Sequence, residues 1–475
     1  MESRVTHLAL EAADESLSDA AIGSLRESFR GQLTRPAEPG YDEARRVWNA
    51  TVDRHPAIVA HCTGTADVVA AVRFARAEGL EIAVRGGGHS VAGHGTVNGG
   101  IVIDLSPMRG VRVDPDARVA WVQGGAVLGQ LDHETALHGL ATTAGTVSHT
   151  GVGGLTLGGG YGYLARRHGL ACDNVLSAEL VTADGELVVA SETRNADLLW
   201  GLRGGGGNFG IVTAFEFRLH PALPMAATGD LFFDLQDGPA ALRAVSDLAD
   251  QMPAEMLLAA VVADVRAEWG IEELEVGRPV VIVSWVFLGD AGEGRSTAAS
   301  LYAAAHPLLE SAEALSYLRL QSYSDAGQRS GMRRYWKGGF VWELPDAAIE
   351  AFLDRGTDGG GPPLWGGELI SLGGAIARVG EEDTAYSGRT ARFDFLTLSS
   401  WEDQAEDERR LAGARRYWAG MARHLRGPAY VNSLEDEGTD RVRQAYGPAK
   451  YDRLVALKRR YDPDNLFHLN QNVRP

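Results

Sequence analysis

The chain of 475 residues has little cysteine, no run of basic residues and no long apolar segment. Its two cysteines, Cys62 and Cys172, are too few for a disulfide framework or a cysteine-based zinc site. A net charge of −18 at pH 7 would repel a phosphate backbone, so we do not expect a nucleic-acid partner. The N-terminus has acidic residues where a signal peptide needs an apolar core. We therefore expect a cytoplasmic protein without a membrane span or a membrane partner.

Glycine, in contrast, is abundant, with 59 residues, and it is concentrated in two tracts. The first, Arg85-Gly-Gly-Gly-His-Ser90, follows the strand-like run 80–84, and the second spans residues 151–162. Because glycine lacks a Cβ atom, backbone N–H groups can approach a phosphate or a flat ring. Two such tracts in one chain indicate a long, folded nucleotide that is held between two loops.

The first half of the chain has the pattern of a mixed α/β lobe. We expect a helix over 18–32 in an N-terminal arm, and a second helix that begins at Thr65 and ends at Gly79, before the first glycine tract. Further expected elements are hairpin strands at 100–105, 111–123 and 179–189, a helix at 197–203 and a strand at 211–219.

A boundary is indicated by His220-Pro-Ala-Leu-Pro224, after which aromatic residues become frequent. The second lobe is expected to end with a long helix over 401–425, and the remaining tail to return to the first lobe. Trp336, Trp342 and Trp365 are candidates for lining a pocket or for core packing.

The segment Gly205-x-Gly207-x-x-Gly210 matches the dinucleotide-binding pattern, but it follows a helix and precedes a strand. A Rossmann site needs the opposite order, so that the helix N-terminus faces the pyrophosphate. A nicotinamide site is therefore the weaker interpretation. The P-loop pattern is absent from the sequence, which sets ATP chemistry aside.

Several motifs in this order resemble those of the vanillyl-alcohol oxidase superfamily, and within it the berberine bridge enzyme-like oxidases. They are found at 68–76, 84–90, 99–106, 145–162, 169–175, 197–212, 461–467 and 470–472. The resemblance implies an α+β fold: a FAD-binding lobe of two α/β subdomains, and an α/β substrate lobe whose antiparallel sheet lies over the flavin. The implied division is an arm (1–40), a FAD-binding domain (41–224), a substrate-binding domain (225–427) and a C-terminal segment that returns to the FAD-binding domain (428–475).

The resemblance also implies which residues bind FAD. They come from both glycine tracts, from the segments before and after the second tract, from residues 210–212 and from the C-terminal tail. The set is Arg85, Gly86, Gly87, Gly88, His89, Ser90, Gly145, Thr146, Thr150, Gly151, Gly153, Gly154, Gly158, Tyr161, Gly162, Asp173, Asn174, Gly210, Ile211, Val212, Asn470 and Asn472.

In that family, the histidine that matches His89 is joined covalently to the flavin 8α-methyl carbon. A neutral imidazole nitrogen is a competent nucleophile for this bond. Some members carry a second tether from a cysteine, but the matching position here is Val147, so a single covalent bond to FAD is implied. A metal site built on His89 and His94 is a weak alternative, because no carboxylate cluster accompanies them, and we expect no metal.

Oxidation of a C–H bond by a flavin needs a base for the attached O–H or N–H group. By resemblance, an expected strand at 428–435 supplies it, with Tyr430 as the base and Asn432 on the same face. Relatives often have a second tyrosine where this chain has Ser433. Tyr386 is the other candidate base.

By the same resemblance, Thr150 stands where relatives admit or block oxygen at the flavin, and an oxidase is favoured over a dehydrogenase. The expected activity is a FAD-linked oxidase of a hydroxyl- or amine-bearing small molecule, such as a sugar, a phenolic or a secondary metabolite, with O2 as acceptor. The alternatives are a flavin dehydrogenase or oxidative cyclase of the same fold, and a non-catalytic flavin-binding protein. The sequence does not give the oligomeric state.

Overall fold

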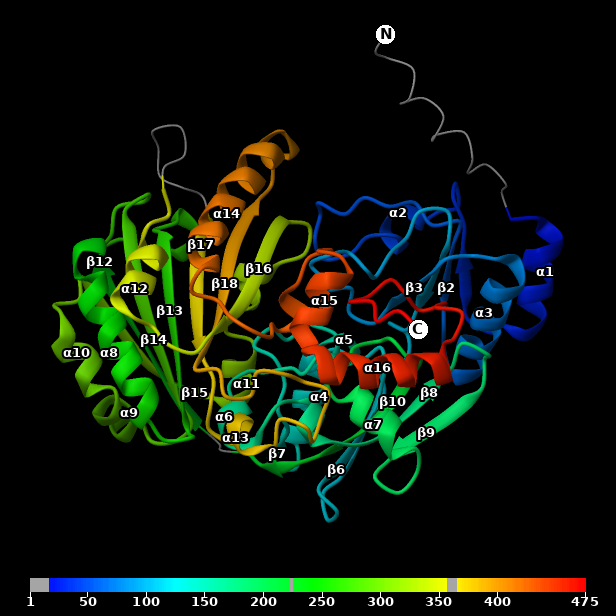
Figure 1. Ribbon diagram of the computed structural model, residues 1–475, viewed down its shortest axis with the longest axis horizontal. Helices are drawn as coiled ribbons and strands as arrows, with labels where there is room; N and C mark the ends of the chain where they lie inside the picture. The colour runs from blue at the N-terminus through cyan, green and yellow to red at the C-terminus, as the bar shows by residue number, and fades with distance from the viewer. Residues whose placement is uncertain (1–16, 223–224, 357–364) are drawn as a thin grey trace, which may run out of the picture.

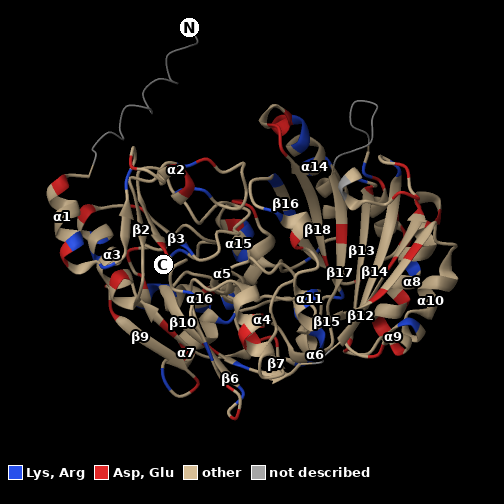
Figure 2. Cartoon of the chain, turned by 180° about the vertical axis from the view of Figure 1, so that it is seen from behind, with Lys and Arg blue, Asp and Glu red and all other residues tan. Residues whose placement is uncertain are grey.

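The computed structural model describes residues 17–222, 225–356 and 365–475, which form two lobes side by side (Figure 1). The start of the expected N-terminal arm and the Leu223-Pro224 end of the expected boundary lie outside the described residues. Acidic residues are distributed over both lobes, with lysines and arginines among them (Figure 2). No helix in the described ranges is both long and apolar enough to span a membrane.

A four-stranded sheet opens the first lobe, in the order β1-β2-β4-β3. Its strands are β1 (Gln32–Thr34), β2 (Ile58–His61), β3 (Ile82–Arg85) and β4 (Ile101–Asp104). Helix α3 (Thr65–Glu78) ends where Gly79 adopts the left-handed conformation, which confirms the expected start and end of this helix. It delivers the chain into β3, which lies parallel to β4.

The expected helix over 18–32 is too long, because α1 covers only Asp19–Ser28. Residues 32–34 pair instead with β2, with Gln32 opposite His61. A tertiary pairing therefore overrides the helical pattern at this end.

The second sheet of this lobe is antiparallel, in the order β5-β6-β10-β8-β9. Its strands are β5 (Val111–Asp114), β6 (Val119–Gln123), β8 (Val175–Val181), β9 (Leu187–Ser191) and β10 (Ile211–Arg218). The expected hairpins β5–β6 and β8–β9 are confirmed. The expected hairpin strand at 100–105 is wrong, because β4 pairs in parallel with β2 and β3 in the first sheet.

The second lobe is built on a seven-stranded antiparallel sheet, in the order β15-β12-β14-β13-β17-β18-β16. Its strands are β12 (Met225–Asp234), β13 (Met256–Asp264), β14 (Pro279–Phe287), β15 (Leu309–Ser316), β16 (Arg333–Val341), β17 (Trp365–Ser371) and β18 (Phe393–Trp401). Helices α8 (Gly238–Gln251), α12 (Asp346–Leu353) and α14 (Asp407–Ala422) pack on one face over an apolar core (Figure 1). This arrangement confirms the α+β class and the antiparallel sheet.

The opposite face of this sheet packs against the first lobe. Ala226, Leu257 and Val286 on this face form one core cluster with Tyr163 and Leu164. Because side chains alternate along a strand, this face also carries Asp394, which meets Tyr161 of the second glycine tract.

Two further expectations are wrong, one in the residue where a helix begins and one in the type of element. The helix expected over 401–425 begins only at Asp407, because Trp401 is the last residue of β18 and its indole N–H donates to Asp407 Oδ1 at 2.7 Å. The strand expected at 428–435 is a 3-10 turn over Val431–Ser433, with Tyr430 directly before it. Gly338 of β16 leaves room for Ser433, so the turn packs beside the edge strand instead of extending the sheet.

The C-terminal segment returns to the first lobe through α15 (Thr439–Tyr446) and α16 (Pro448–Tyr461) (Figure 1). The fully buried Lys458 of α16 donates to Asp462 Oδ2 at 2.7 Å, to the Asn208 carbonyl at 2.9 Å and to the Phe467 carbonyl at 2.8 Å. This buried cation joins the tail to the glycine loop at 204–210.

Candidate active site

The two glycine tracts meet backbone to backbone. A Cβ atom on Gly87 would lie 2.3 Å from the amide nitrogen of Gly151, and a Cβ atom on Gly151 would lie 2.3 Å from the amide nitrogen of Gly87. Gly88 has a φ of +70°, a conformation that L side chains rarely adopt. Only glycine fits at these contacts, so the two loops form one clasp.

Arg85, at the end of β3, anchors the first loop. Its buried guanidinium pairs with Asp104 at 3.1 Å and donates to the carbonyls of Ala44 and Arg46. The side chain therefore ties the loop to β4 and to the N-terminal segment.

His89 lies at the centre of a cluster of rings. Its Nε2 atom is 2.7 Å from Nδ1 of His149, and its ring stacks on Trp48 with centroids 4.6 Å apart and an interplanar angle of 18°. Burial, together with repulsion from His149 and Arg334, lowers the pKa of His89 to about 3. His89 is therefore neutral at pH 7, as a nitrogen nucleophile must be.

The second glycine tract carries a cluster of tyrosines and one carboxyl group. The Tyr161 hydroxyl donates to Asp394 Oδ2 at 2.6 Å, and the rings of Tyr161 and Tyr430 have centroids 5.0 Å apart. The Tyr430 oxygen accepts hydrogen bonds from the Gly160 N–H at 3.2 Å and from Asn432 Nδ2 at 2.9 Å. These two donors fix the Tyr430 hydroxyl against the second tract.

Burial governs the ionisation of this cluster. It raises the pKa of Asp394 to about 7, a shift that the Tyr161 hydrogen bond opposes and the nearby Glu368 adds to. It also raises the pKa of Tyr430, against the two hydrogen bonds that favour the phenolate. Burial also raises the pKa of the nearby Glu368 to about 7, so Asp394 and Glu368 both change their charge near neutral pH.

Tyr386 lies deeper in the same cluster. Its side chain is buried, its ring centroid is 6.2 Å from that of Tyr430, and its hydroxyl has no hydrogen-bond partner within the described residues. The structure thus brings both candidate bases together, with Asn432 beside Tyr430.

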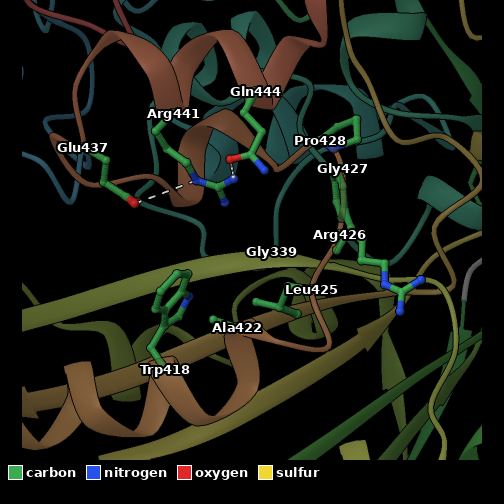
Figure 3. Close-up of a pocket in the computed structure, with 11 residues that line it drawn as sticks. Gly339, Trp418, Ala422, Leu425, Arg426, Gly427, Pro428, Glu437, Arg441 and Gln444 are labelled. Carbon is green, nitrogen blue, oxygen red and sulfur yellow. Dashed lines mark hydrogen bonds and ion pairs between the residues drawn. The ribbon is translucent and has the colours of Figure 1, made fainter.

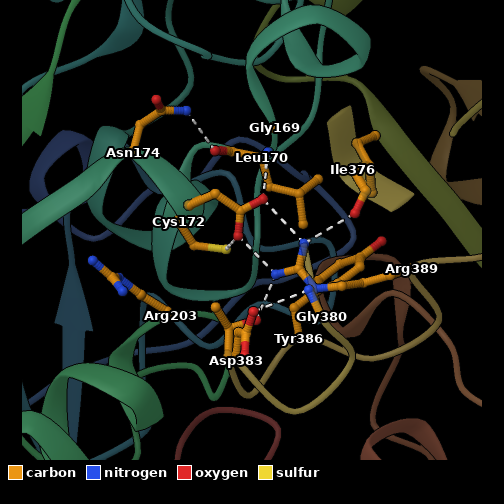
Figure 4. Close-up of polar contacts among 12 residues, drawn as sticks. Gly169, Leu170, Cys172, Asn174, Arg203, Ile376, Gly380, Asp383, Tyr386 and Arg389 are labelled. Carbon is orange, nitrogen blue, oxygen red and sulfur yellow. Dashed lines mark hydrogen bonds and ion pairs between the residues drawn. The ribbon is translucent and has the colours of Figure 1, made fainter. Parts of the chain in front are cut away.

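Arg389 of the second lobe reaches the Leu170–Asn174 segment of the first lobe (Figure 4). Asp173 forms an ion pair with the buried Arg389 at 2.7 Å and accepts the Leu170 N–H at 2.9 Å. Asn174 donates to the Leu170 carbonyl at 2.9 Å. Cys172, directly before Asp173, is fully buried, and burial raises the pKa of its thiol, as suits a small core residue.

The other predicted FAD-binding residues line the same region. Gly162 packs on the Ala144 carbonyl beside Gly145, while Gly210, Ile211 and Val212 open β10 against β8. Ser90 follows His89 and accepts the His94 N–H at 3.3 Å. Thr146 precedes Val147 in the loop that leads to His149, and Gly153, Gly154 and Gly158 line α5 (Val152–Leu157).

These residues fit a bound FAD on two observations. The glycine clasp provides backbone that no side chain covers. In addition, the buried Oδ1 atoms of Asn470 and Asn472 lack hydrogen-bond partners in the described chain, and so does the Tyr386 hydroxyl. Buried polar atoms without partners are costly, and a polar cofactor would satisfy them. Among the described residues, no three His, Cys, Asp or Glu side chains are grouped to hold a metal ion.

A cavity of about 150 Å³ lies beside the chain that leads into Tyr430 (Figure 3). Trp418 of α14 and the Glu437–Arg441 pair face it from opposite sides (Figure 3). Phe340 lines it, and the Phe340 ring also contacts Tyr386 with centroids 6.2 Å apart. Phe340 therefore lies next to both the cavity and the tyrosine cluster.

Sequence reasoning missed three residues of the site: Asp394, Glu368 and His149. Asp394 and Glu368 are each the one charged residue of their strands, β18 and β17, and this signal was available in the sequence. Ile370 of β17 stands opposite Asp394 of β18, so both carboxyl groups lie on the face that packs against the first lobe. His149 stands two residues before the second tract, but only the folded chain brings it to His89. By contrast, Trp365 belongs to the core under α14 and lines no site.

Two segments of the chain match known protein families. Residues 56–191 match the family described as "FAD binding domain", and residues 429–474 match "Berberine and berberine like". The second match covers Tyr430 and the C-terminal asparagines.

Similar proteins cover nearly the whole chain. (R)-6-hydroxynicotine oxidase of Paenarthrobacter nicotinovorans is 30% identical, over 94% of this chain and 97% of its own. Glucooligosaccharide oxidase of Sarocladium strictum is 31% identical, over 92% and 91%.

Solved structures agree with these matches. The 6-hydroxy-D-nicotine oxidase of Arthrobacter nicotinovorans superposes with a TM-score of 0.85 at 29% identity, over 94% of this chain and 98% of its own. The glucooligosaccharide oxidase of Acremonium strictum has a TM-score of 0.85 at 26% identity, over 96% and 99%, and carries a 6-S-cysteinyl, 8α-N1-histidyl FAD.

Because the two loops of the glycine clasp are in backbone contact, we expect a single added methyl group to disrupt it. Gly87→Ala would place a Cβ atom 2.3 Å from the Gly151 backbone, so the loops must separate. We expect the purified variant to lose most of its FAD and to unfold at a lower temperature, as measured by absorbance and calorimetry. Gly420→Ala, where a Cβ atom meets nothing within 4 Å, is the control. Full FAD content in Gly87→Ala would contradict the clasp.

Proposed function

Because the chain belongs to the berberine bridge enzyme-like family of FAD-linked oxidoreductases, we propose that it oxidises a hydroxyl- or amine-bearing carbon of a small molecule, with FAD tethered to His89 and O2 as acceptor. When bound, FAD supplies the acceptor for a hydride from the substrate. The observation that carries the proposal is the Tyr430 hydroxyl, which two N–H donors hold at the second glycine tract.

In this proposal, Tyr430 acts as a phenolate, after its own proton has passed to solvent, and accepts the proton of the substrate O–H or N–H group. The Gly160 N–H and the Asn432 amide donate to its oxygen and stabilise the phenolate that burial disfavours. Asp394 holds the neighbouring Tyr161 hydroxyl and, once ionised, provides a second proton acceptor in the cluster. Neither group needs a metal ion.

The substrate class is proposed from the relatives. One is named for 6-hydroxynicotine and another for glucooligosaccharides, an amine-bearing and a hydroxyl-bearing compound. Oxidation at either kind of carbon needs a base and a hydride acceptor. A dehydrogenase or oxidative cyclase would use the same residues, and a non-catalytic flavin-binding protein would not need them. In an oxidase, substrates of either kind should bleach the flavin absorbance, and air should restore it with formation of peroxide. This result distinguishes an oxidase from these alternatives.

The tether to His89 predicts flavin that survives denaturation. Acid-precipitated protein should stay yellow, and the tryptic peptide with His89 should carry the mass of FAD, because the neutral His89 is held in a glycine-flanked loop. His89→Ala should bind FAD without a covalent bond and reduce it more slowly. Complete release of flavin by acid, or FAD on the Cys172 peptide, would overturn the assignment.

Replacement of the proposed base should slow flavin reduction without unfolding the protein. Tyr430→Phe keeps the ring and its packing but loses the oxygen that accepts two hydrogen bonds. We expect stopped-flow flavin reduction to fall by about 10²–10⁴-fold, the usual range for a positioned base. Tyr386→Phe serves as the matched variant. A wild-type rate in Tyr430→Phe with a slow Tyr386→Phe would transfer the role to Tyr386.

The ionisation of Asp394 predicts the pH dependence of flavin reduction. Since burial raises its pKa to about 7, the carboxyl group is neutral below that pH and can accept a proton only above it. The rate should therefore rise with pH up to about 7, by at most roughly tenfold per pH unit, and then level off. Asp394→Asn should flatten the profile, whereas Tyr430→Phe should keep its shape at a lower rate. An unchanged profile in Asp394→Asn would exclude this role.

A further inference from the structure

His89 and His149 form a hydrogen-bonded pair at the clasp. The distance between His89 Nε2 and His149 Nδ1 is 2.7 Å, and the ring centroids are 4.7 Å apart. One of the two nitrogens must carry the hydrogen. If it is His89 Nε2, then His89 Nδ1 holds the free lone pair, and Nδ1 lies 3.4 Å from the Thr150 hydroxyl.

Formation of the bond to the flavin would leave a positive charge on His89 unless the ring also loses a proton. An imidazole that forms a bond through Nδ1 while keeping its Nε2 hydrogen becomes a cation. Burial and the nearby Arg334 strongly disfavour a cation at this ring, as the lowered pKa of His89 records. The Nε2 proton must therefore leave as the bond forms, and His149 Nδ1 lies on its path.

We propose that His149 is the proton acceptor for attachment of the flavin to His89, so that the chain catalyses its own modification through a histidine pair. The proposal rests on the covalent FAD proposed above. A bond forms between His89 Nδ1 and the 8α carbon, and one C–H bond of that methyl group breaks with its proton passing to water. The Nε2 proton moves to His149 Nδ1. Two electrons remain on the flavin ring and pass to O2, which with two protons becomes hydrogen peroxide.

Both lobes hold the pair in place. Ser148, next to His149, donates from its N–H and its hydroxyl to Asp325 of the second lobe, at 2.8 and 2.6 Å. On the other side, Trp48 stacks on His89, and the Arg334 guanidinium lies 3.9 Å from the centre of the Trp48 ring. His149 is only half-buried, so water can take up the proton that it accepts.

The test follows attachment itself. The full-length chain is purified from riboflavin-depleted cells, mixed with FAD and sampled into acid over time. Covalent FAD is measured by in-gel fluorescence and by the mass of the His89 peptide. In His149→Asn, the side-chain oxygen replaces Nδ1 and accepts the hydrogen bond but cannot hold the proton. We expect attachment to slow by about 10²-fold or more, with reversible FAD binding retained.

Two matched variants complete the test. Imidazole added to His149→Ala should restore part of the attachment rate, which a purely structural role would not predict. His168→Asn, at a histidine that stacks on His220, should attach FAD at the wild-type rate. Wild-type attachment in His149→Asn, or loss of FAD binding in both His149 variants, would overturn the proposal. If wild-type protein attaches no FAD, the tether fails as well, whereas substrate-driven bleaching of reversibly bound FAD would leave the oxidase activity standing.

Discussion

The contact between the backbones of Gly87 and Gly151 is the constraint on which the rest of the site depends. It joins the end of β3 in the first sheet to the start of α5, and the Gly124 carbonyl, just after β6, lies close to both Gly86 and Gly153. Three segments therefore converge where no side chain can be accommodated. The direction of α5, and with it the position of the Gly158–Gly162 loop, follows from this convergence.

The second lobe completes the site with the face of its sheet that packs against the first lobe. Burial there raises the pKa of Asp394 and of Glu368, each to about 7. Stability alone would favour apolar residues at such positions, as on the opposite face of the same strands. Carboxyl groups that are held near their ionisation point beside tyrosines therefore support the proposal that the reaction takes place at this face.

Much of the fold could be predicted from the sequence because its local signals agree with its tertiary structure. Helix α3 has a clear apolar face and a glycine end, and the hairpins β5–β6 and β8–β9 turn at short polar segments. The predictions at 18–32, 100–105 and 428–435 were wrong for one physical reason. Each segment is placed by a partner distant in sequence: β2 for residues 32–34, β2 and β3 for β4, and β16 for the turn after Tyr430.

The residues of the site could be predicted from the sequence only in part. Glycines and His89 stand in motifs that can be recognised, whereas Asp394 and His149 acquire a role only through neighbours 233 and 60 residues away, Tyr161 and His89. Each of these contacts depends on the docking of the lobes, since Asp394 belongs to the second lobe and Asp325 of that lobe anchors the loop before His149. Docking of the lobes thus brings Asp394 to Tyr161 and anchors the loop before His149. On the proposals made above, covalent flavin would therefore mark the molecules that have also assembled the tyrosine cluster.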